Sequence, residues 1–79
     1  MSPVEQAILE ILDSRRGEEI LGRELRGLLR NRGFRRTAPS LVFTMMSLQD
    51  KGLVTCREVV RVIDGVEVRE RYYSSRTDG

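Results

Sequence analysis

Arginine supplies nearly all of the positive charge in this sequence, and most of it lies in one segment. Fourteen residues are Lys or Arg against 12 Asp or Glu, and Lys51 is the single lysine. Eight arginines stand between residues 15 and 36, with three glutamates among them. The planar guanidinium fits phosphate oxygens and guanine edges better than an ammonium does. The segment is therefore either a nucleic-acid-binding surface or an ordinary solvated helix face in an arginine-rich protein.

Directly after the last of these arginines, residues 37–54 read TAPSLVFTMMSLQDKGLV. Wound at helical period, this stretch places most of its apolar side chains on one arc and small hydroxyl side chains on the other. The arc expected to face the core consists of Leu41, Val42, Met45, Met46 and Leu48. The opposite side holds Ser40, Thr44, Ser47 and Lys51, with Phe43 at its edge. We expect this hydroxyl side to lie against DNA.

The sequence offers little for catalysis or metal binding. It contains no histidine, so the commonest general base and metal ligand is absent. Cys56 is the single cysteine, which precludes an intrachain disulfide and favours a core residue over a nucleophile. Ser74-Ser75 has no base partner, and the glycines form no phosphate-cradling motif. We therefore expect no enzyme, no cofactor and no metal site.

Composition bounds the remaining possibilities. At 79 residues the chain has room for one domain with a modest core. Hydrophobic content of 39% and charged content of 33% are typical of a small soluble domain. No apolar run approaches the length of a membrane span, and no secretory signal is visible. A cytoplasmic protein with no membrane partner is the expectation, since one unpaired cysteine fits a reducing compartment.

Three helices must position these residues. Ser2 is expected to cap the first helix, with Pro3 at its first position and Glu5 in its first turn. The apolar stripe of this helix consists of Val4, Ala7, Ile8, Ile11 and Leu12. The second runs from about residue 18 or 21 to residue 32 and buries Leu21, Leu25, Leu28 and Leu29. The third covers about 38–51, between a capping Thr37 and Gly52. The short link after Gly33 makes the second and third helices a helix-turn-helix pair.

A β-hairpin is predicted after the third helix. Residues 53–63 are rich in β-branched side chains, and Asp64-Gly65 is a strong signal for a two-residue turn. This turn places Ile63 opposite Val66 and Glu58 opposite Arg71. Three helices followed by a two-stranded hairpin form the α+β winged helix-turn-helix order, with the hairpin at 54–73 as the wing. The domain is expected to cover residues 1–73, with 74–79 as a flexible tail.

The sequence resembles PadR-type winged-helix transcriptional regulators. The resemblance rests on the stretch Ile20–Leu25, on residues 38–54 and on the closing Glu70-Arg71-Tyr72-Tyr73. It implies that the third helix enters the major groove and that the wing touches the DNA backbone or minor groove. The helix would contribute Thr37, Ser40, Phe43, Thr44 and Ser47, and the wing would contribute Arg61 and Arg69. Regulators of this kind continue beyond the wing into a dimer-forming helix, which residues 74–79 are too short to supply.

Two functions remain open from the sequence. The first is a transcriptional regulator, with repression favoured, that binds double-stranded DNA as a homodimer. Its phosphate contacts would come from Arg23, Arg26, Arg30, Arg35 and Arg36. The second is a winged-helix module that binds another protein, for which each arginine would be paired with a glutamate. Phe43 is ambiguous: burial under the wing is slightly favoured over an exposed contact to thymine methyl groups or to a partner.

Overall fold

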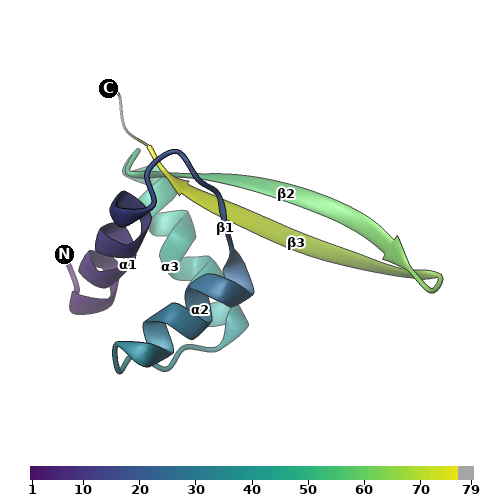
Figure 1. Ribbon diagram of the computed structural model, residues 1–79, viewed down its shortest axis with the longest axis horizontal. Helices are drawn as coiled ribbons and strands as arrows, with labels where there is room; N and C mark the ends of the chain where they lie inside the picture. The colour runs from purple at the N-terminus through teal and green to yellow at the C-terminus, as the bar shows by residue number, and fades with distance from the viewer. Residues whose placement is uncertain (77–79) are drawn as a thin grey trace.

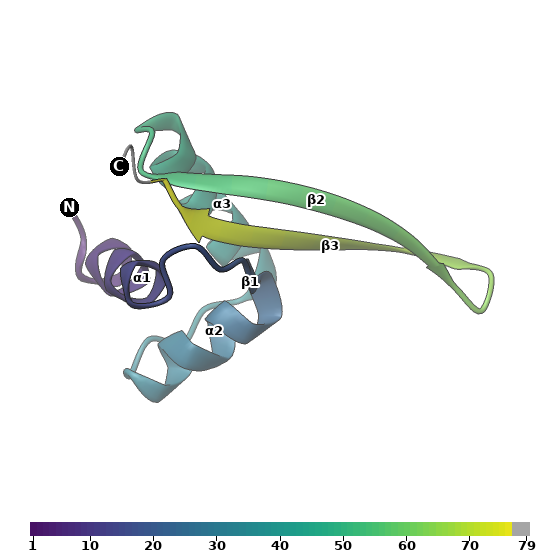
Figure 2. The same cartoon turned by 45° about the horizontal axis from the view of Figure 1, so that its top comes forward.

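The computed structural model describes residues 1–76, which form three helices and a three-stranded antiparallel sheet. The elements are α1 (Pro3–Ser14), β1 (Ile20–Leu21), α2 (Gly22–Asn31), α3 (Ala38–Asp50), β2 (Val54–Ile63) and β3 (Val66–Ser75). The helices gather around one end of the sheet, and the β2–β3 hairpin runs far beyond them (Figures 1 and 2). The predicted winged-helix arrangement is confirmed. None of the helices in this part of the chain is both long and apolar enough to cross a bilayer.

Side-chain caps fix where α1 and α3 begin, as the sequence predicted. Ser2 and Glu5 form a reciprocal pair: the Glu5 amide donates to the Ser2 hydroxyl at 3.3 Å, and the Ser2 amide donates to the Glu5 carboxylate at 3.1 Å. The bond from the Ser2 amide, followed by the contact with the Ser2 side chain, holds the pKa of Glu5 below its usual range. Thr37 accepts from the Ser40 amide at 3.2 Å and so caps α3.

The core joins all three helices to the root of the sheet. The fully buried side chains include Ile8 of α1, Leu25 and Leu29 of α2, and Leu48 of α3. The other buried residues are Val4, Ala7, Ile11, Leu12, Ile20, Leu41, Met45, Val54 and Tyr73. The expected stripe of α1 is buried in full, and Tyr73 is the wing tyrosine that packs onto the helices.

The second helix begins later than expected because the preceding residues form a strand. Ile20 and Leu21 make up β1 and pair with Tyr73 and Tyr72 of β3, so the sheet order is β1-β3-β2. Leu21 is therefore a strand residue and not part of the α2 stripe, and α2 starts at Gly22. A pairing across some fifty residues of chain leaves no mark in local periodicity, which explains why the sequence did not reveal this strand.

The register of the wing is the predicted one. Asp64 and Gly65 both have positive φ, at 52° and 77°, as a two-residue turn between twisted strands requires. Ile63 pairs with Val66, and Glu58 lies opposite Arg71 with a 3.3 Å ion pair between their side chains. The pairing continues without a bulge to the base of the hairpin.

The end of the wing differs from the sequence-based boundary. β3 continues two residues past Tyr73, so Ser74 and Ser75 belong to the sheet and not to a flexible tail. The Ser74 and Thr55 hydroxyls hydrogen-bond across the strands at 2.6 Å, and the Ser75 hydroxyl donates to Asp13 at 2.7 Å. These polar partners replace the apolar contact whose absence suggested a loose end. The remainder of the predicted tail, residues 77–79, lies outside the described residues.

Candidate nucleic-acid interface

Four arginines border one open hollow at the start of α3. Arg26 and Arg30 come from α2, and Arg35 and Arg36 come from the link between the helices; Thr37 completes the lining. We call this feature the arginine hollow. It places four of the five predicted phosphate-binding arginines around a single site.

The link returns beside α2 because Gly33 ends that helix in the left-handed conformation, at φ 88°. The Gly33 amide donates to the Arg30 carbonyl and the Phe34 amide donates to the Leu29 carbonyl, both at 2.9 Å. Phe34 packs against the core at this point. The next residues, Arg35 and Arg36, are thereby held next to the last turns of α2.

The arginine hollow carries charge that the protein does not neutralise. Within residues 1–76, none of its four arginines forms an ion pair, whereas eight other basic residues do. Arg16 and Arg76 are the other two without one in that range, and neither borders the hollow. The N-terminus of α3 adds the partial positive charge of the helix dipole. The hollow is therefore suited to an anion.

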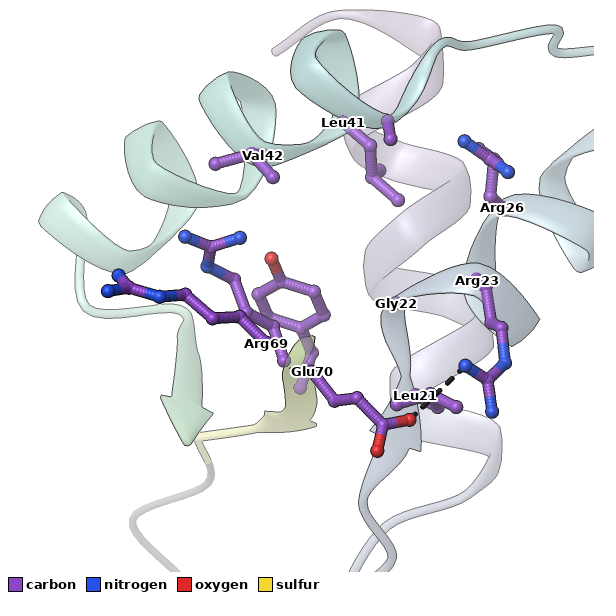
Figure 3. Close-up of a pocket in the computed structure, with 11 residues that line it drawn as sticks. Leu21, Gly22, Arg23, Arg26, Leu41, Val42, Arg69 and Glu70 are labelled. Carbon is purple, nitrogen blue, oxygen red and sulfur yellow. Dashed lines mark ion pairs between the residues drawn. The ribbon is translucent and has the colours of Figure 1, made fainter. Parts of the chain in front are cut away.

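A second concavity separates α2 and α3 from the wing (Figure 3). This wing notch encloses about 180 Å³ and is lined by Leu21, Gly22, Arg23, Arg26, Ala38, Leu41, Val42, Arg69, Glu70, Arg71 and Tyr73. Its floor includes apolar side chains, and its rim carries four arginines and one glutamate. Arg26 borders both the wing notch and the arginine hollow, which makes it the residue common to the two basic concavities.

The remaining predicted arginine contacts are already engaged inside the protein. Glu70, whose side chain is 11% exposed, forms ion pairs with Arg23 of α2 at 3.2 Å and with Arg61 of β2 at 2.8 Å. Arg61 also donates to the Tyr72 hydroxyl at 3.3 Å. Arg69 lies 3.7 Å from both Glu58 and Glu67. These arginines brace the wing against α2 and against itself, and they stand apart from the arginine hollow.

The outward side of α3 coincides only in part with the side that the sequence indicated. Ser40 and Thr44 are half-buried, and the Thr44 hydroxyl donates to the Ser40 carbonyl at 3.1 Å. The reason is that this side lies beside the start of α1, where Lys51 pairs with Glu5 at 3.3 Å. Ser47 alone of the three small hydroxyl residues in the helix is exposed.

Two of the five residues assigned to the core arc of α3 are not buried. Met46 is 52% exposed, and Val42 is half-buried along the wing notch (Figure 3). Phe43 is 72% exposed, so the favoured expectation of burial under the wing was wrong. The wing projects away from the helices (Figure 1) and does not cover the Phe43 side chain. Phe43 instead borders a shallow hollow with Arg36, Thr44 and Ser47.

Cys56 has the properties of a structural residue. It is half-buried, packs against the core and pairs with Tyr73 in the sheet. Burial raises the pKa of its thiol and thus keeps the thiol protonated. Among residues 1–76, no three His, Cys, Asp or Glu side chains are grouped in a way that could hold a metal ion.

Comparisons with known proteins support the fold. The sequence matches no protein-family model and no curated protein. Among solved structures, the chain is similar to Bacillus subtilis PadR crystallised with operator DNA, with a TM-score of 0.69 and 21% identity. The alignment covers 98% of this chain and 42% of the PadR chain, so this chain spans less than half of the length of PadR. The resemblance to PadR-type regulators is confirmed at the level of the fold.

Proposed function

We propose that this domain binds double-stranded DNA and acts as a transcriptional regulator. The arginine hollow carries the proposal, because it gathers four arginines without an internal partner among residues 1–76 at the turn between the two helices of the helix-turn-helix. The structural similarity to a protein solved in complex with operator DNA supports the same function. Repression follows as the favoured mode, since a protein bound across a promoter blocks access to it.

The protein-binding alternative required an arginine surface balanced by glutamates. Much of the molecule has that balance, including the wing, where Arg61, Arg69 and Arg71 all meet carboxylates. The arginine hollow lacks it. We therefore assign phosphate binding to Arg26, Arg30, Arg35 and Arg36, which would hold the backbone while α3 lies in the major groove. The wing arginines would contribute less, because their charge is already shared with Glu58, Glu67 and Glu70.

A homodimer is the arrangement we propose on a two-fold symmetric site. One α3 carries few long polar side chains toward solvent, and two copies would double the number of bases contacted. Two-fold symmetry would place the two α3 helices about one helical turn of DNA apart, roughly 34–36 Å. The footprint of the protein on DNA would then cover two half-sites.

The dependence of binding on salt tests this function. We expect fluorescence anisotropy with a labelled duplex to give an affinity that falls linearly, on logarithmic axes, with salt concentration between about 50 and about 200 mM. Four neutralised phosphates predict a slope of roughly −3 to −4 for each bound domain. A slope near zero, or no binding at low salt, would contradict the proposal.

A further inference from the structure

The outward side of α3 is an apolar ridge. Pro39, Phe43 and Met46 follow helical spacing along one side of the helix, and all three are exposed. We call them the α3 ridge. Single exposed apolar residues are common on protein surfaces. Here two large side chains, at 72% and 52% exposure, stand together on the helix that borders the arginine hollow.

Charge around the α3 ridge fits duplex DNA as its occupant. Phe43 shares a concave surface with Arg36 and with Glu5, whose carboxylate is paired with Lys51, and Arg36 also lines the arginine hollow. An apolar protein partner would have to accommodate the four arginines of that hollow. A DNA backbone neutralises them while the adjacent groove faces the ridge. That the ridge faces the major groove of DNA rests on the proposed function.

Hydrogen-bonding readout by this side of α3 is weak. Residues 38–48 contain no charged residue and no Asn or Gln, the residue types that make the sharpest base contacts, and only the last turn of α3 adds an exposed Gln49 and Asp50. The Thr44 hydroxyl already donates to the Ser40 carbonyl. The chemistry that the ridge can read is therefore apolar. In the major groove, the apolar group of the ordinary bases is the 5-methyl group of thymine.

We propose that Phe43 and Met46 read thymine methyl groups, so that the protein prefers sites with thymine at the bases under the α3 ridge. When an aromatic ring or a thioether covers a methyl group, apolar area of both the protein and the DNA is removed from water. This burial corresponds to an affinity gain of about fourfold for each methyl group covered. Pro39 would border the contact at the start of the helix. Selectivity then comes from shape and apolar contact, while the arginine hollow supplies most of the binding free energy.

Replacing thymine with uracil isolates this contact, because the two bases differ only by the methyl group. A preferred duplex is first selected with the full chain from a random-sequence library. It is then resynthesised with uracil at each thymine in turn. We expect affinity to fall about fourfold at each position under the ridge. The double variant Phe43→Ala/Met46→Ala should bind the thymine and uracil duplexes equally well with its salt dependence unchanged. Gln49→Ala, the control at an exposed position of the same helix outside the ridge, should keep the preference.

The outcomes separate this inference from the proposed function. If the unmodified protein binds the thymine and uracil duplexes equally well and retains the steep salt dependence, methyl readout is wrong and DNA binding stands. If Phe43→Ala and Met46→Ala leave the loss of affinity for uracil duplexes intact, the α3 ridge does not contact the thymine methyl groups and instead binds another protein. If no duplex is bound in a salt-dependent way, both proposals fail. Circular dichroism of each variant establishes that it is folded.

Discussion

Replacing Arg35 and Arg36 together by alanine is expected to reduce affinity for duplex DNA about sixty-fold near 0.1 M salt. For each phosphate contact that is lost, about one fewer counterion is released when the protein binds. At this salt concentration, that change lowers the affinity roughly eightfold. The slope of log affinity against log salt should also become shallower by about 1.8. Both residues are exposed and neither has an ion pair within residues 1–76, so folding should be unaffected. Anisotropy titrations at several salt concentrations give both quantities.

A matched control distinguishes a binding site from a general effect of charge. Arg16 and Arg76 are also exposed arginines without an ion pair in the described part of the chain, and they lie away from the arginine hollow. Replacing both by alanine changes the net charge by the same amount. We expect that variant to lose less than about threefold, because distant exposed charges are largely screened at 0.1 M salt. Equal losses in the two double variants would mean that the hollow is not a specific phosphate site.

Leu48→Ala is expected to destabilise the domain by about 2–5 kcal/mol, the cost typical of emptying a buried leucine site. The Leu48 side chain is fully buried and holds the last turns of α3 on the core. A chain of 79 residues has a total unfolding free energy of only about 4–12 kcal/mol. The variant should therefore lose a large fraction of its stability. Urea denaturation followed by circular dichroism measures the loss.

Phe43→Ala provides the contrasting case on the same helix. Because Phe43 is largely exposed, its removal should change the unfolding free energy by no more than about 0.5 kcal/mol. A loss comparable to that of Leu48→Ala would show that Phe43 is covered in solution. The outward position of the α3 ridge would then be incorrect.

Features with local causes were predictable from the sequence. Ser2 and Thr37 cap the helices as expected because capping requires only a side-chain oxygen and the next turn of the chain. The Asp64-Gly65 turn determined the register of the whole wing, including Glu58 opposite Arg71. The order of elements then left the winged helix as the simplest arrangement. Arg35 and Arg36 lie at the start of α3 because they stand in the short link, whereas Arg26 and Arg30 reach the same hollow from α2.

Features that depend on tertiary neighbours were not predictable in this way. Helical periodicity identifies the centre of the buried arc, and Leu41, Met45 and Leu48 are indeed buried. It does not identify which flank of the arc a neighbouring helix covers. The start of α1 lies beside the flank of α3 that carries the hydroxyl side chains. The opposite flank, which includes Met46, therefore faces solvent. The pairing of β1 with β3 and the engagement of Glu70 by Arg23 and Arg61 likewise join residues far apart in sequence.

These differences change the site that the sequence suggested. The expected base-reading side of α3 lies partly against α1, and three of the expected arginines are used within the protein. Of the predicted DNA contacts, the arginines of the arginine hollow are the ones whose arrangement best suits phosphate binding. Its four arginines remain free of ion pairs among the described residues.

The central claim is that the arginine hollow and the exposed side of α3 together face duplex DNA. Amide NMR spectra of the isotope-labelled protein, recorded while a short duplex is added, test it most directly because they report on every part of the chain at once. We predict that the largest shifts fall on Arg26, Arg30, residues 35–37 and the exposed positions of α3, with smaller shifts in the wing. Shifts confined to α1 or to the far end of the wing, with residues 35–37 unchanged, would contradict the claim.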